Sequence, residues 1–165
     1  MCLILIAHQF TAEAPLLVLA NRDEFYDRPT AAAGPWKDCR DLIAGRDLVS
    51  GGTWFGARGL RWASVTNVRE NMHRHSHSSR GWLVRDYLLS NDPPQEFLLK
   101  IAGQVPEYAG FNLLLGNGKE LWYCSNRGRA AQRVEPGIYG LSNHLLDTPW
   151  PKVKRGKDAL RKLMK

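Results

Sequence analysis

The sequence predicts an α+β fold in which antiparallel strands and helices occupy separate stretches of the chain. Apolar runs of strand length come first, two helical segments follow together, and further strands and a last helix come after them. Such segregation is typical of antiparallel layered folds and not of alternating βαβ units. An Asn-Gly pair between apolar runs indicates one clear hairpin. A length of 165 residues, 44% of them apolar, predicts a single domain over residues 1–165.

The first two strands are predicted at residues 2–7 and 16–20, joined by a polar link. Both are apolar without alternation, which predicts strands covered on both faces. If they pair as an antiparallel hairpin, the start of the first lies opposite the end of the second. Cys2 would then lie beside the polar residues that follow residue 20.

The next stretch, residues 21–36, is rich in turn formers, and we predict a loop there. Two short strands are expected around 53–58 and 60–67. The glycines of the SGGTWFG segment indicate that backbone approaches something closely, either a ligand or another strand. The polar residues 69–79 are predicted to form a loop.

Two helices should follow. Ser78 or Ser79 is expected to cap a helix over 80–89, with Tyr87 on its buried stripe. A second helix, over 93–103, opens with prolines and is stopped by a glycine.

The last third begins with the clearest hairpin, residues 111–126, turned at Asn117 and Gly118. Two short strands are expected around 130–135 and 137–143. The chain from 152 onward is predicted to be helical. Its apolar side should carry Val153, Leu160, Leu163 and Met164.

The formal net charge of +7 is concentrated at one end of the sequence. Residues 152–165 hold seven basic residues and one acidic residue, so the rest of the chain carries only +1. A nucleic-acid groove needs positive charge along one face together with aromatic platforms, and the sequence has no such arrangement. We therefore expect no nucleic-acid partner and a solvated basic helix face.

The compartment follows from what the sequence lacks. No apolar stretch is long enough for a membrane span, and no basic leader precedes the first strand, so neither a transmembrane segment nor a signal peptide is expected. Cys2, Cys39 and Cys124 are far apart and form no C-x-x-C pair, which indicates a reducing compartment. The sequence therefore predicts a cytoplasmic protein.

Three histidines alternate in the HRHSH segment, at His73, His75 and His77. Side chains that alternate along an extended segment share a face, which suits a metal ion. However, only Glu70 lies near in sequence, and the coordination set is incomplete. We expect a solvated loop and no metal site.

The ANRDEFYDRP segment places Asn21, Arg22, Asp23 and Glu24 directly after a buried strand. These groups could simply cap a turn and pair with one another. Clustered charged groups are costly to bury, however, and they are often found where they hold a ligand or shift one another's pKa. The sequence leaves both alternatives open.

Cys2 also has two interpretations. It could be a buried structural cysteine, or the nucleophile of a chain from which Met1 has been removed. In the second case its own α-amine, with a reference pKa of about 7.7–8.0, could take the proton of the thiol. Asp23 could orient that amine, and Arg22 could stabilise the thiolate.

Four asparagines are candidates to support such chemistry. Asn67 and Asn143 each finish a predicted strand, from which an amide could donate to a developing oxyanion. Asn112 and Asn126 are weaker candidates for the same role.

At this point the sequence resembles the NRDE family, whose eukaryotic members are called transport and Golgi organization protein 2. The resemblance rests on an ordered set of motifs. They are MC, ANRDEFYDRP, GGTWFG, VTN, RG, GFNLLLG, NRG, GIYGLSN and DTPWPK.

The resemblance implies an N-terminal-nucleophile-hydrolase-like αββα sandwich of antiparallel sheets. In related hydrolases the cysteine after Met is the nucleophile, so the resemblance gives that role to Cys2. It also implies that Asp23 holds the α-amine and that Asn67 and Asn143 take the oxyanion side. Arg22 is adjacent to the matched carboxylate and does not match the first arginine of those hydrolases.

The resemblance brings no settled reaction, but it implies a role in haem trafficking or in lipid and acyl-CoA metabolism. We therefore expect a protein that handles a small anionic amphipathic ligand, either haem or an acyl-CoA, with no required cofactor. Cys2 or one of the alternating histidines could ligate haem iron. The expected ligand-binding residues are Asn21, Glu24, Arg28, Trp54, Arg80 and Asn112.

The alternative is a cysteine amidohydrolase that cleaves a linear C–N bond. It requires the removal of Met1, because otherwise Cys2 has an amide nitrogen and no basic amine. Family members also continue through a further helix and strands, so the family domain is expected to be short at its C-terminal end.

Overall fold

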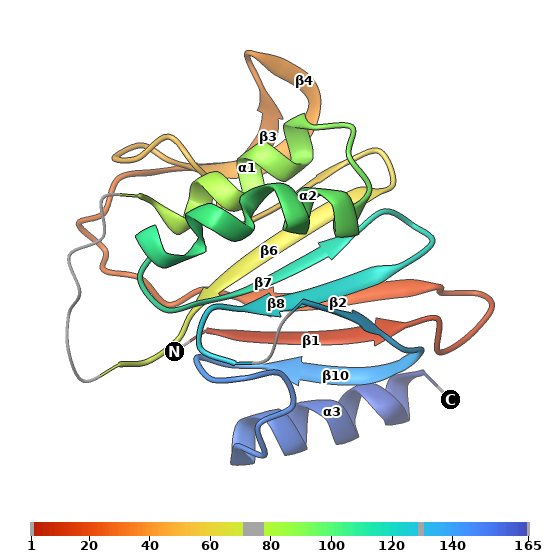
Figure 1. Ribbon diagram of the computed structural model, residues 1–165. Helices are drawn as coiled ribbons and strands as arrows, with labels where there is room; N and C mark the ends of the chain where they lie inside the picture. Colours follow the sequence, from red (N-terminus) through yellow and green to blue (C-terminus); the bar gives the residue numbers. More distant parts are fainter. Residues whose placement is uncertain (1, 71–77, 129–130, 165) are drawn as a thin grey trace.

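The computed structural model describes residues 2–70, 78–128 and 131–164. Figure 1 shows these residues as two stacked antiparallel sheets with helices on both outer sides. From top to bottom of that view the layers are helix, sheet, sheet and helix. The predicted α+β class and its antiparallel strands are confirmed.

The smaller sheet has the strand order β10-β1-β2 among the described residues, and both pairs are antiparallel. Its strands are β1 (Leu3–His8), β2 (Leu16–Asn21) and β10 (Gly137–Leu141). The helix α3 (Pro151–Leu163) packs against it, with Leu160 buried beside Ala7 and Ile138. The predicted hairpin and terminal helix are therefore confirmed, although Leu163 is 77% exposed.

The prediction that both N-terminal strands are covered on both faces is wrong for β2. In the described chain β2 is the edge of the smaller sheet, and its last three residues are exposed. A continuous apolar run does not distinguish a central strand from an edge strand, because both can contain the same residues.

The larger sheet runs in sequence order from β3 to β9, each strand antiparallel to the next among the described residues. Its strands are β3 (Thr30–Trp36), β4 (Cys39–Asp47), β5 (Phe55–Arg58), β6 (Arg61–Asn67), β7 (Phe111–Gly116), β8 (Leu121–Ser125) and β9 (Gln132–Val134).

The predicted loop at residues 21–36 is wrong in its second half, because residues 30–36 form β3. Gly34 and Pro35 weaken the strand signal there. An edge strand tolerates both, and the β3–β4 register shifts on either side of them.

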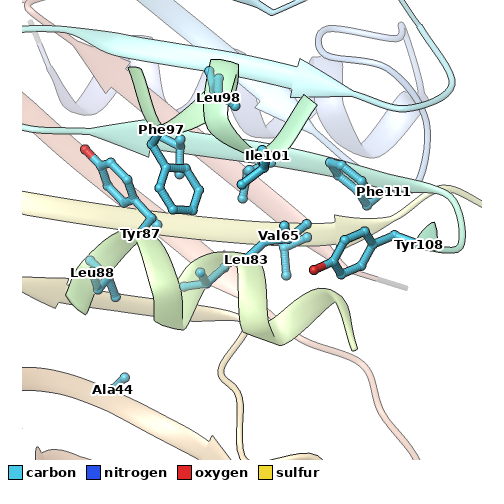
Figure 2. Close-up of a cluster of buried hydrophobic side chains, with 14 of the residues drawn as sticks. Ala44, Val65, Leu83, Tyr87, Leu88, Phe97, Leu98, Ile101, Tyr108 and Phe111 are labelled. Carbon is cyan, nitrogen blue, oxygen red and sulfur yellow. The ribbon is translucent and has the colours of Figure 1, made fainter. Parts of the chain in front are cut away.

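Helices α1 (Arg80–Leu89) and α2 (Pro94–Ile101), followed by the 3₁₀ turn η1 (Ala102–Glu107), cover the outer face of the larger sheet. Figure 2 shows the core beneath them, where the Tyr87 and Phe97 rings meet edge to face with their centroids 5.3 Å apart. Of the helices that the structure describes, none has the length and apolarity to cross a membrane.

A second core lies between the two sheets. Ile4 and Ile6 of β1 pack there against Trp62 and Leu114 of the larger sheet. Gly116 allows this packing, because an added Cβ would lie 2.1 Å from the indole nitrogen of Trp62.

The close approach expected of the SGGTWFG glycines is found at Gly56, which lies against β4, and at Gly52, which meets the start of α1 and not another strand; a Cβ on Gly51 would meet nothing within 4 Å. A Cβ on Gly52 would lie 2.6 Å from the carbonyl carbon of Gly81, in the first turn of α1. The Thr53 N–H donates to the Gly81 carbonyl at 3.2 Å. The loop before β5 is therefore clamped against the start of α1.

We expect Gly52→Ala to lower the free energy of unfolding by about 1–3 kcal/mol, because backbone atoms cannot move aside as a flexible side chain can. Urea denaturation measures this change. Gly34→Ala is the matched control, because nothing lies within 4 Å of an added Cβ there. Equal stability of the two variants would contradict the clamp.

Candidate functional site

The site lies at the start of β1, between β2 and β10. Leu3 is opposite Asn21 of β2, and Ile4 is opposite Leu141 of β10. One step beyond the β1–β2 register, Cys2 comes next to Arg22, and both residues line the same cavity. The predicted meeting of Cys2 with the polar end of the second strand is therefore confirmed.

A cavity of about 540 Å³ opens beside Cys2. It is walled by the start of β1, the segment after β2, strands β3 to β6 and the first turn of α1. Of the residues predicted from the sequence, those that line it are Cys2, Arg22, Asp23, Glu24, Arg28, Trp54, Asn67 and Arg80. Asn21, Asn112 and Asn143 do not line it.

The Cys2 side chain is buried at the closed end of this cavity. Burial raises the pKa of its thiol, and the positive charges of Arg22 and Lys152 offset this only in part. The thiol of this structure is therefore mostly protonated at neutral pH. Lys152 of α3 also donates to the Cys2 carbonyl at 3.2 Å.

Most cavity arginines already have carboxylate partners. Arg22 pairs with Glu24 at 2.7 Å, and Arg28 pairs with Asp47 at 2.6 Å. Burial tends to raise the pKa of Asp47, but Arg28 and the N–H groups of Val49 and Ser50 lower it overall. The sequence left open whether Arg22 and Glu24 pair with each other or hold a ligand. In the structure they pair with each other.

Arg80 differs from these arginines. Among the described residues no carboxylate lies within ion-pair distance of its guanidinium, which donates from Nη1 to the Gly110 carbonyl at 3.0 Å. Burial lowers the pKa of Arg80, and the negative charges of Glu24 and Glu70 act against this. Its side chain is a partly buried cation on the cavity wall.

Two of the predicted asparagines lie at the edge of the site. Asn143 has φ +46° and donates to the Asn67 carbonyl at 3.4 Å, which joins the two sheets there. Asn21 donates to Asp23 Oδ1 at 3.0 Å.

Asn112 lies in the core between the sheets, contrary to the expectation of a ligand-binding residue. It is fully buried, and its amide donates to Thr66 Oγ1 and to the His144 carbonyl. Its carbonyl accepts from the Tyr123 hydroxyl at 2.7 Å. Asn126 similarly bonds to backbone groups around residues 108–111. These hydrogen bonds use the groups that a ligand would need.

The sequence analysis missed Lys152 and two threonines. Thr53 and Thr66 line the closed end of the cavity, each 2% exposed. A threonine in a strand carries no functional signal of its own, and Lys152 is one of many basic residues in its segment. The histidines at 73, 75 and 77 fall outside the described residues, so the expectations about metal and haem iron there stay predictions.

Comparison with known proteins gives a consistent result. A family model described as Transport and Golgi organisation 2 matches residues 1–165. Over 153 residues the chain is 39% identical to the Transport and Golgi organization protein 2 homolog of Bos taurus, which covers 86% of this chain and 55% of that protein. The Mus musculus homolog is 37% identical over 153 residues, with the same shares covered.

Transport and Golgi organization protein 2 of Drosophila melanogaster is 26% identical over 167 residues, which covers 91% of this chain and 59% of that protein. The chain thus spans about half the length of the curated relatives it matches. The resemblance seen in its motifs is confirmed, and the chain belongs to the Transport and Golgi organisation 2 family.

Proposed function

We propose that this chain handles a small anionic amphipathic ligand, which it binds in the cavity beside Cys2. The observation that carries the proposal is the lining of that cavity. Arginine side chains share it with Phe25, Trp54, Phe55 and Val65. A volume of about 540 Å³ is within the usual range for sites that enclose small molecules.

Haem and an acyl-CoA are the first ligands to test. Both combine a large apolar portion with anionic groups, which suits a wall of arginine and aromatic residues. Cys2 could ligate haem iron, since its sulfur lies at the closed end of the cavity. The names of the relatives concern transport and not hydrolysis, which favours handling over chemistry. A cytoplasmic location remains part of this proposal.

Titration of the purified chain with hemin and with dodecanoyl-CoA should give saturable binding for at least one of the two. The measurement is the Soret absorbance for hemin and tryptophan fluorescence for dodecanoyl-CoA. Haem ligated by Cys2 should show a Soret shift that is lost in Cys2→Ala. Absence of saturable binding for both ligands would refute the proposal.

A second function is favoured by one specific arrangement. Cys2, Arg22, Asp23 and Asn67 line the same cavity, and Asn143 donates to the Asn67 carbonyl. Together with the helix-sheet-sheet-helix layers, this supports an N-terminal-nucleophile-hydrolase-like cysteine amidohydrolase. After removal of Met1, the Cys2 amine would take the thiol proton, and the thiolate would attack an amide carbon. The C–N bond would break to leave an acyl-thioester while the amine departs with that proton, and water would then hydrolyse the thioester to release the acid and restore the thiol.

The pH dependence of Cys2 alkylation separates the two functions. In a Cys39→Ser/Cys124→Ala background, iodoacetamide reports on Cys2 alone. With Met1 present, alkylation at pH 7.5 should be slower than that of free cysteine, because the raised thiol pKa reduces the thiolate fraction. The rate should increase as the pH rises beyond about 8.5.

A chain prepared to start at Cys2 should react faster at pH 7.5 if the amidohydrolase proposal holds, because the free amine can take the thiol proton. The same slow rate in both preparations would count against hydrolysis. Fast alkylation with Met1 attached would contradict the buried, protonated thiol.

A further inference from the structure

The cavity has a polarity that further defines the proposed function, on which the following inference rests. Cys2, Thr53 and Thr66 are buried and form its closed end. At its open end Phe25 is 80% exposed, and Ala31 and Ala33 of β3 are also exposed. The exposed part of the lining thus holds these apolar side chains beside the carboxylates of Asp23 and Glu24, whereas the buried part holds Cys2, the two threonines and Val65.

The backbone of Arg80 is fixed at the start of α1. Its neighbour Gly81 packs against Gly52 and accepts the Thr53 N–H, and Thr53 and Arg80 both line the cavity. The hydrogen bond from Nη1 to the Gly110 carbonyl then orients the guanidinium. A binding group that is fixed in this way loses little entropy when a ligand arrives.

Within the described residues Arg80 makes no ion pair, although the negative charges of Glu24 and Glu70 act on it from further away. Arg22, Arg28 and Arg46 each have a carboxylate within 3.2 Å, whereas no carboxylate lies within ion-pair distance of Arg80 in this part of the chain. A guanidinium has five N–H donors, and a partly buried one gains most from an anion that binds two of them.

We propose that Arg80 binds the carboxylate of a single-chain amphiphile that enters the cavity head first. The carboxylate lies beside Cys2, and the hydrocarbon chain runs outward past Phe25, Ala31 and Ala33. Carboxylates match the planar guanidinium in a bidentate arrangement, which gives the site its chemical selectivity. The opposite orientation would place a hydrocarbon chain against a charged group and lose this bond.

Three probes test the orientation: dodecanoate, its methyl ester, and dodecanoate with a bulky fluorophore at the far end of the chain. The fluorophore should be tolerated, with a Kd within about threefold of that of dodecanoate. The methyl ester should bind at least about tenfold more weakly, because it lacks the charge. The reverse pattern, or failure of the wild-type chain to bind dodecanoate, overturns the inference.

Two variants test the residue. Arg80→Met should weaken dodecanoate binding at least about tenfold and leave binding of the methyl ester unchanged, which also shows that the cavity is intact. Arg58→Met is the matched control, since Arg58 pairs with Asp41 and does not line the cavity, and the Kd should change less than about twofold.

Equal losses in the two variants, or no loss in Arg80→Met, overturn the role of Arg80. If Arg80→Met also loses binding of the methyl ester, Arg80→Lys, which keeps the positive charge, is measured as well. Failure of Arg80→Lys to recover dodecanoate binding then counts against the inference. The proposed function itself fails only if wild-type protein binds neither hemin nor dodecanoyl-CoA. The two failures are therefore distinguishable.

Discussion

The antiparallel register of β1 is the constraint on which the site depends. Leu3 opposite Asn21 and Ile4 opposite Leu141 fix which residues flank Cys2. A slip by one residue would turn Ile4 and Ile6 out of the core between the sheets, so that core stabilises the register. The hydrophobic packing of β1 thus determines the surroundings of a polar site at its end. Lys152 adds a contact from α3 to the Cys2 carbonyl, which ties the last helix to the same point.

Ion pairs between arginines and carboxylates determine the charge of the cavity wall. Isolated charges are costly to bury, and the pairs Arg22–Glu24 and Arg28–Asp47 reduce that cost within the protein. These pairs leave the cavity wall polar but nearly balanced, and Arg80 is the exception in the described chain. The close backbone contact between Gly52 and Gly81 stabilises the start of α1. Because Arg80 is the neighbour of Gly81, the same contact also positions Arg80. If Arg80 binds as proposed, stability and binding depend on the same backbone contact.

Local signals predicted much of this fold, while the site needed long-range information. Helix α1 and the β7–β8 hairpin follow from an apolar stripe and an Asn-Gly turn, which act over a few residues. Strand β3 was missed because its alanines, Gly34 and Pro35 have weak strand preference, and its pairing with β4 decides its structure. Arg80 is among the ligand-binding residues expected from the sequence, but its lack of an ion pair could not be predicted, because that depends on which arginines find carboxylates from distant segments. For the same reason Asn112 resembled Asn67 in sequence, although one is buried between the sheets and the other lines the cavity.

The two proposed functions use the same cavity. They differ in whether the backbone nitrogen of Cys2 is an amide or a free amine. With Met1 attached, the nitrogen of Cys2 is an amide that cannot accept a proton, and the buried thiol stays protonated. Such a thiol can contact a ligand but is a poor nucleophile. Without Met1 the same nitrogen becomes an amine with a reference pKa of about 7.7–8.0, which in the proposed amide hydrolysis would take the thiol proton. An anion held by Arg80 would lie beside the sulfur in both cases. Amide hydrolysis releases a carboxylic acid. The proposed contact with Arg80 would therefore hold the carboxylate of a bound ligand in one function and the carboxylate of the product in the other.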